Sequence, residues 1–341
     1  MNSKPSKPAP QKSQPSQNQP LMVRGSIPYW DQTNAVKSMT DHADELNQVA
    51  LFWYYINPDG QITKYQYAQA DPNILATAHA HHIKTLFTIT NLGEQAGDDW
   101  DSTRVEKVIG DNASRSSHIN SIMSMFNKLP FDGVTIDYEQ VAPSQRSNFT
   151  VFIRQLAARL HQQNKLLNVA LHPITSSEAA GRYYFQDDAS LAQSADYVTV
   201  MTYDEHENGS SAGPIASYPW VSQAVAYLKN NNLPMHKVFL GIPVYGYDWI
   251  QDSNSPATDL TYQDTQIKLG KLDEALKWDN AAKSPYFSYI DQGQSHTVWF
   301  ENAESIDQKL KLAQANHLGG VSLWRLGEED PAIWPKISAY Q

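Results

Sequence analysis

Eight short apolar segments constrain the fold of this 341-residue chain more than any other feature. Each is rich in β-branched and aromatic residues, which is typical of buried strands. The segments span residues 25–30, 48–55, 83–90, 132–138, 166–171, 196–202, 237–242 and 318–324. We expect each of them to form one strand.

Several stretches between these segments show helical periodicity. Apolar residues recur there at spacings of three and four, as on one face of a helix. The clearest examples are Phe149, Phe152, Ile153, Leu156 and Leu160 after Pro143, then Ile119, Ile122, Met123 and Phe126, and finally Val221, Val225 and Leu228. Strands that alternate with helices favour a parallel sheet, and eight such units predict a (β/α)8 TIM barrel. A doubly wound open sheet is the competing architecture, but no Gly-rich phosphate loop follows any segment.

The spacing of the last two segments predicts an insertion in the barrel. They begin 81 residues apart, and residues 247–301 between them contain alternating aromatic residues such as Tyr286 and Tyr289. We interpret this stretch as a small α+β insertion between strands 7 and 8. No second linker follows Gly25, so residues 25–341 are expected to form a single barrel domain.

The N-terminal segment, residues 1–24, has a different composition. Its first twenty residues are mostly Pro, Ser, Gln and Lys, which bury too little apolar surface to order a chain, so we expect a disordered tether. Residues 1–30 carry a net charge of +4, which leaves −14 for the rest of a chain whose total is −10. The segment has no apolar core and is not a secretory signal, so a stalk left after removal of a signal or anchor is the favoured interpretation.

Composition excludes several function classes. The chain has no cysteine, which rules out disulfides, cysteine-type zinc or iron–sulfur sites and a thiol nucleophile. An acidic chain is not expected to bind nucleic acid, which needs a basic surface. No apolar run approaches the roughly 20 residues of a membrane-spanning helix, so no transmembrane segment is expected.

The fourth segment ends in two carboxylates, where barrel enzymes place their catalytic groups. Side chains alternate along a strand, so Thr135, Asp137 and Glu139 share the face toward the barrel interior. Two adjacent buried carboxylates do not both ionise easily, so one should keep a proton near neutral pH. A protonated Glu139 beside an ionised Asp137 suits a general acid for glycosidic oxygen. The alternative is that the pair caps the strand end and the following helix.

The sequence resembles glycoside hydrolase family 18, the chitinase-like barrels. Residues 132–139 (DGVTIDYE) are similar to the family signature DGxDxDxE with one position changed, and residues 201–204 (MTYD) match its MxYD segment. Trp324 matches the tryptophan that forms the floor of the sugar pocket. The resemblance is strongest to the bacterial spore-germination and cortex-lytic branch, through residues 201–206, 213–220, 241–249 and 321–331, and it extends from Ser26 to Trp334.

This resemblance implies substrate-assisted catalysis with retention. Glu139 would protonate the leaving oxygen, and the sugar's own 2-acetamido oxygen would attack the anomeric carbon, which departs from the usual two-carboxylate scheme. Asp137 would hold the amide N–H and stabilise the oxazolinium ion. Tyr203 would donate a hydrogen bond to the acetamido oxygen. Asp204 would bind the distorted sugar, and Met201 belongs to the same substrate-binding segment.

Three further residues are expected to contact substrate. Tyr29 and Trp324 end their segments, and aromatic faces stack on sugar rings, although packing is the commoner role of a single aromatic residue. Asn91 ends the third segment and is a candidate sugar contact. Thr135 stands where many chitinases have another aspartate. A neutral side chain here removes one buried like charge, so it should ease the ionisation of Asp137 and affect the pH optimum.

No metal or other cofactor is expected. His79, His81 and His82 have a spacing that does not gather three imidazoles on one helix face. The acidic and histidine residues at 204–207 are consecutive, and neighbours on a loop rarely converge on one ion. The resemblance to the family explains these four residues better, as part of the polar rim of the sugar-binding site.

We therefore expect a retaining β-N-acetylglucosaminidase that acts on a polysaccharide containing N-acetylglucosamine, either peptidoglycan or chitin-like. A chitinase and an endoglycosidase of N-glycans are the enzymatic alternatives. The other alternative is an inactive lectin on the same fold, but such lectins usually lack the glutamate that this chain keeps at position 139. A monomer is expected, secreted or associated with the cell wall or spore of a bacterium.

Overall fold

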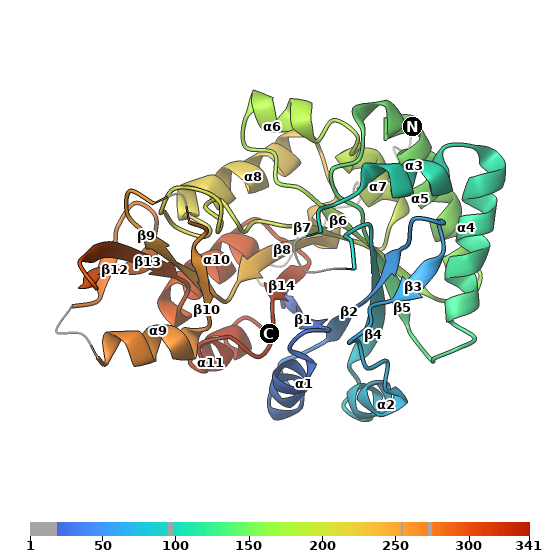
Figure 1. The fold of residues 1–341 in the computed structure, drawn as a ribbon. Coiled ribbons are helices and arrows are strands. Elements are labelled where there is room, and N and C mark those ends of the chain that lie inside the picture. The colour runs from blue at the N-terminus through green and yellow to red at the C-terminus, as the bar shows by residue number, and fades with distance from the viewer. Residues whose placement is uncertain (1–18, 95–97, 254, 272–274) are drawn as a thin grey trace, which may run out of the picture.

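The computed structural model describes residues 19–94, 98–253, 255–271 and 275–341. In these residues, eight parallel strands close into a barrel in the order β1, β14, β8, β7, β6, β5, β4 and β2, and β2 pairs again with β1 (Figure 1). The predicted (β/α)8 barrel is confirmed. Its strands are β1 (Met22–Pro28), β2 (Gln48–Ile56), β4 (Lys84–Thr90), β5 (Gly133–Asp137), β6 (Leu166–Leu171), β7 (Tyr197–Val200), β8 (Val238–Pro243) and β14 (Gly320–Trp324). A short β3 (Ile62–Lys64) extends β2 as an antiparallel hairpin.

Helices connect the strands and cover the outside of the barrel (Figure 1). They are α1 (Gln32–Asp41), α2 (Pro72–Ala80), α3 (Ser102–Ile109), α4 (Asn112–Met125), α5 (Arg146–His161), α6 (Ser177–Arg182), α7 (Asp188–Ser194), α8 (Tyr218–Asn230), α10 (Ala303–Ala315) and α11 (Ile333–Ser338), with 3-10 turns at Pro143–Gln145 and Met235–Lys237. The three stretches with predicted helical periodicity correspond to α4, α5 and α8, with Phe126 at the C-terminal end of α4 and Pro143 in the turn before α5. Several helices begin at an aspartate, such as Asp71, Asp101 and Asp111, whose side chain accepts a hydrogen bond from a backbone N–H of the first turn.

The predicted insertion between the seventh and eighth barrel strands is a five-stranded antiparallel sheet with one helix. Its elements are β9 (Gly246–Ile250), β10 (Thr258–Leu260), α9 (Tyr262–Leu269), β11 (Lys277–Asp279), β12 (Ser284–Asp291) and β13 (Gln294–Phe300), and the sheet order is β10, β9, β13, β12, β11. The sheet projects to one side of the barrel, next to α10 (Figure 1). Phe287, Val298 and Phe300 form part of its own small core.

The first strand begins earlier than the sequence indicated. β1 starts at Met22 and pairs with β14 from that residue, so the predicted boundary at Gly25 is three residues late. Arg24 interrupts the apolar run with a charge, but its side chain lies inside the barrel and is 1% exposed. Residues 1–18 of the predicted tether lie outside the described residues.

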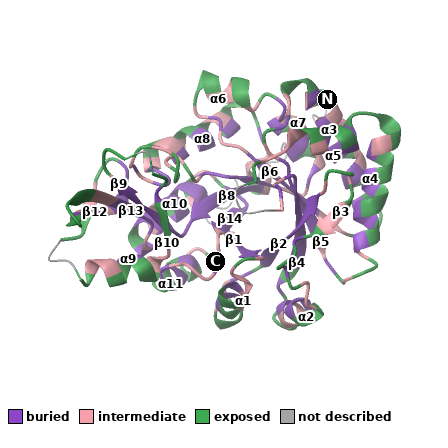
Figure 2. Cartoon of the chain, in the orientation of Figure 1, coloured by how far each residue is buried: buried purple, intermediate pink, exposed green. Residues whose placement is uncertain are grey.

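Burial follows the layers of the fold. The barrel strands are buried almost throughout, while the helices expose their outer faces (Figure 2). Among the described residues, no helix is both long and apolar enough to cross a membrane. The carboxyl ends of the barrel strands meet at one face, and this face positions the candidate site.

Candidate active site

Side chains of β5 and of the residue after it alternate, as predicted, between the barrel interior and the helix-covered outside. Thr135 and Asp137 line a pocket at the centre of the barrel. Tyr138 points the other way, where its ring stacks on Phe152 with centroids 6.1 Å apart and its hydroxyl lies 2.7 Å from Nε2 of His118. The strand is therefore anchored on its outer face, and this fixes the direction of its inner carboxylate.

The negative charge of Asp137 acts on the neighbouring carboxyl of Glu139. Asp137 is 8% exposed, and its Oδ1 has no hydrogen-bond partner among the described residues. Burial raises the pKa of Asp137 to about 7. The pKa of Glu139 is raised well above its usual value by burial and by the negative charges of Asp137, Asp204 and Asp99. Both effects favour the protonated form of Glu139.

Asn91 positions Glu139 and does not face the pocket. Its Oδ1 accepts a hydrogen bond from the Glu139 backbone N–H at 2.8 Å, and its Nδ2 donates to the Glu139 carbonyl at 2.9 Å. The side chain is fully buried, so the expectation that Asn91 contacts sugar is wrong. Gln140, the next residue, has φ of 51°, so the chain turns sharply just after the carboxylate that Asn91 holds.

Tyr203 and Asp204 follow β7, which lies two strands from β5 in the barrel. Tyr203 lines the same pocket as Asp137, and burial keeps the pKa of its hydroxyl well above the usual value, so it remains a donor. Asp204 adopts φ of 59°, and its Oδ1 accepts a hydrogen bond from the Tyr245 hydroxyl at 2.5 Å. A Cβ at Gly241 would stand 2.8 Å from the Tyr203 ring, so only glycine leaves room for the ring in this position.

Of the other predicted contacts, two lie in the pocket and one does not. Trp324 and Met201 line it, and the Trp324 ring stacks on Tyr203 at 6.1 Å with an interplanar angle of 13°. Tyr29 instead stacks on Tyr65 at 4.3 Å and is not among the pocket-lining residues.

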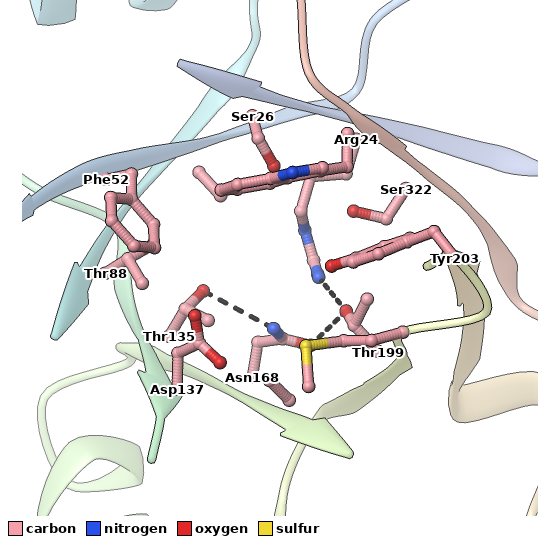
Figure 3. A pocket seen from close by; sticks show the side chains of 14 residues that line it. Arg24, Ser26, Phe52, Thr88, Thr135, Asp137, Asn168, Thr199, Tyr203 and Ser322 are labelled. Atoms are coloured by element: carbon pink, nitrogen blue, oxygen red, sulfur yellow. Dashed lines mark hydrogen bonds between the residues drawn. The ribbon is translucent and has the colours of Figure 1, made fainter. Parts of the chain in front are cut away.

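Sequence reasoning missed a polar chain beneath Asp137 (Figure 3). Arg24 donates to Thr199 at 2.7 Å, Thr199 donates to the Asn168 amide oxygen at 3.0 Å, and the Asn168 amide nitrogen lies 3.4 Å from Thr135. Burial lowers the pKa of Arg24 to about 9. The alternation of Val23, Arg24 and Gly25 before Ser26 was the available signal, since it places Arg24 and Ser26 on one face.

The histidines considered for metal binding have other positions. His79 lies 2.8 Å from Asp132, which also accepts a hydrogen bond from the Thr85 backbone N–H at the start of β4, away from the catalytic face. In the part of the chain that the structure describes, no group of three or more His, Asp or Glu residues is arranged to hold a metal ion.

A (β/α)8 barrel whose fourth strand leads into an Asp–Glu pair, with the aromatic residues Phe52, Tyr203 and Trp324 lining the same pocket as Asp137, is typical of the glycosidase class. A sequence model of glycosyl hydrolases family 18 matches residues 26–329. The chain therefore belongs to glycoside hydrolase family 18.

Relatives support the same assignment. A putative sporulation-specific glycosylase of Bacillus subtilis, YdhD, is 28% identical over 291 residues, which cover 84% of this chain and 67% of that protein. A chitinase structure from Chromobacterium violaceum has a TM-score of 0.85 and 28% identity, covering 94% of this chain and 98% of its own. The spore cortex-lytic enzyme SleL of Bacillus cereus has a TM-score of 0.84 and 25% identity, covering 93% and 74% respectively.

Proposed function

We propose that this protein is a retaining β-N-acetylglucosaminidase that hydrolyses peptidoglycan glycan strands, with the substrate's acetamido group as the nucleophile. The observation that carries the proposal is the Asp137–Glu139 pair. Glu139 holds a proton to donate, and the Asp137 Oδ1, which lacks a partner among the described residues, can accept a hydrogen bond from an amide N–H. Such an acceptor aligns an acetamido group for attack on the anomeric carbon.

The residues around this pair fit the remaining steps. Glu139 gives its proton to the glycosidic oxygen as the bond to the anomeric carbon breaks and the acetamido oxygen bonds to that carbon. Tyr203 donates to the acetamido oxygen, Trp324 offers its ring face to the sugar, and Asp204, the residue after Tyr203, accepts hydrogen bonds from sugar hydroxyls. Glu139, now ionised, takes a proton from the water that opens the oxazoline ring.

Peptidoglycan is proposed as the substrate because a sporulation-specific glycosylase and a cortex-lytic enzyme are among the relatives. The same similarity supports a location outside the cytoplasm, at the wall or the spore.

The test is turnover and binding by a Glu139→Gln variant. Loss of the proton donor should lower turnover of N-acetylglucosamine polymers by about 10²- to 10⁴-fold while binding persists. Glu304→Gln, an exposed residue at the start of α10, is the control and should behave like wild type. Unchanged turnover in Glu139→Gln would contradict the mechanism.

Mass spectrometry of the products decides between the substrates. Fragments of purified peptidoglycan with N-acetylglucosamine at the reducing end support the proposal, whereas release from chitin oligomers alone identifies a chitinase. Binding without products from either polymer identifies a lectin.

A further inference from the structure

A histidine stands next to the proposed catalytic acid. His172 follows β6 directly, and its Nε2 lies 3.4 Å from Oε2 of Glu139. The two side chains are 10% and 18% exposed, and Nε2 makes no hydrogen bond within the described residues. A gap of this length is typical of catalytic hydrogen bonds before substrate closes the site.

The imidazole of His172 is held rigidly in this position. Its ring stacks on Tyr183 with centroids 3.9 Å apart and an interplanar angle of 9°. The backbone is held on both sides by Gln186, whose Oε1 accepts from the His172 N–H at 3.0 Å and whose Nε2 donates to its carbonyl at 2.9 Å. Gln186 is itself buried. Two hydrogen bonds and a stacked ring leave His172 little freedom to turn away from Glu139.

The ring is neutral. Burial lowers the pKa of His172 to about 3, and the positive charge of Arg182 acts in the same direction. A neutral imidazole carries one N–H, which can be placed on Nε2. On the other sides, Glu139 faces the carboxylates of Asp137, Asp204 and Asp99, and all three oppose its ionisation.

We propose that His172 is a positioning residue that donates its Nε2–H to Glu139 and stabilises the carboxylate that forms when Glu139 gives up its proton. This inference rests on the proposed function, because it concerns the same acid. The Glu139 O–H bond breaks, the proton goes to the glycosidic oxygen, and the electron pair stays on Glu139 as a carboxylate. The imidazole proton is shared with that carboxylate but is not transferred, so His172 ends the step unchanged.

Three variants test the kinetic consequence. His172→Phe keeps a ring for stacking on Tyr183 but removes the donor. We expect kcat to fall roughly tenfold with little change in KM, and the basic limb of the kcat profile to move to higher pH. His172→Gln places an amide N–H near the position of Nε2 and should recover most of the loss. His42→Phe is the control, since His42 stacks on Trp334 at 4.3 Å and is remote from the site.

A measurement without substrate separates this inference from the proposed function. Carbon-13 NMR of labelled glutamate carboxyls, with Glu139 assigned through Glu139→Gln, follows its titration in the folded protein. The midpoint should be higher in His172→Phe than in wild type by about half a pH unit or more. An unchanged midpoint, or equal losses in the Phe and Gln variants, would show that His172 only fills space. If the wild-type protein cleaves no polymer but the His172→Phe variant still shows the higher midpoint, the proposed function is wrong and the hydrogen bond from His172 to Glu139 is supported.

Discussion

At the scale of single residues, burial of the Asp137 carboxylate lowers the free energy of unfolding when the group is ionised. Asp137 is buried, no group is bonded to its Oδ1 within the described residues, and its pKa is raised to about 7. An acid whose pKa is higher in the folded than in the unfolded state binds more protons when folded. Stability therefore falls as the pH rises from about 4, the pKa in the unfolded chain, through about 7.

Asp137→Asn should reverse this loss. The variant cannot ionise at this position, so we expect it to match wild type near pH 4 and to be more stable by about 1–3 kcal/mol at pH 8. Thermal unfolding at several pH values measures the difference, and Asp59→Asn at an exposed turn is the control. A difference in melting temperature that stays constant with pH would show that Asp137 ionises as freely in the folded protein as in the unfolded chain. Activity should be lost at every pH.

At the scale of elements, one buried ion pair joins the insertion to the barrel. Nζ of Lys309 in α10 lies 2.7 Å from Oε2 of Glu301, and both side chains are almost completely buried. The Glu301 backbone N–H also donates to the carbonyl of Tyr245, whose hydroxyl binds Asp204. The pair therefore stands next to the segment whose Tyr245 holds the Asp204 side chain.

Lys309→Met should destabilise the fold by about 3–5 kcal/mol, because it leaves a buried carboxylate without its cation. Adding Glu301→Gln removes that charge and should restore at least half of the loss. Urea unfolding measures both effects. Lys311→Met on the same helix removes an exposed lysine that pairs with Asp307, and it should cost less than about 1 kcal/mol. If the single and double variants are equally unstable, packing and not charge explains the effect.

The elements themselves were largely predictable from the sequence, for a physical reason. Strands buried on both faces are nearly continuous apolar runs, and each of the eight predicted segments overlaps a barrel strand. The beginning of β1 was missed because Arg24 interrupts its run with a charge. No local pattern shows that such a charge has partners, which here are Gln48 and Thr199 from two other strands.

At the scale of the whole molecule, the site combines residues that only the closed barrel brings together. The strand-end rule and the family resemblance indicated Asp137, Glu139, Tyr203 and Trp324, and the structure places three of them around one pocket, with Glu139 just beyond the end of β5. Asn91 does lie at the end of a barrel strand as predicted, but its side chain binds the Glu139 backbone and not sugar. Its position at a strand end does not show which of these two partners the side chain faces. His172 was not predicted, because its role depends on its distance from Glu139, which follows a different strand.

The overall charge leads to a prediction about salt. The chain carries −10, but its N-terminus has a positive excess, because Lys4, Lys7 and Lys12 are accompanied by no acid in the first thirty residues. Peptidoglycan with stem peptides is anionic, so long-range repulsion should oppose its approach at low ionic strength. Chitin oligosaccharides are neutral and should not be affected.

We expect KM for soluble peptidoglycan fragments to fall severalfold between about 10 and 150 mM salt, where the Debye length shortens to about 8 Å, while KM for chitin oligosaccharides stays constant. Changing Lys4, Lys7 and Lys12 together to Gln should steepen the dependence for peptidoglycan alone, because it removes the attraction that offsets the acidic barrel. Initial rates with both substrates across a salt series provide the measurement. Equal salt responses for the charged and neutral substrates would show that the net charge of the molecule does not affect substrate capture.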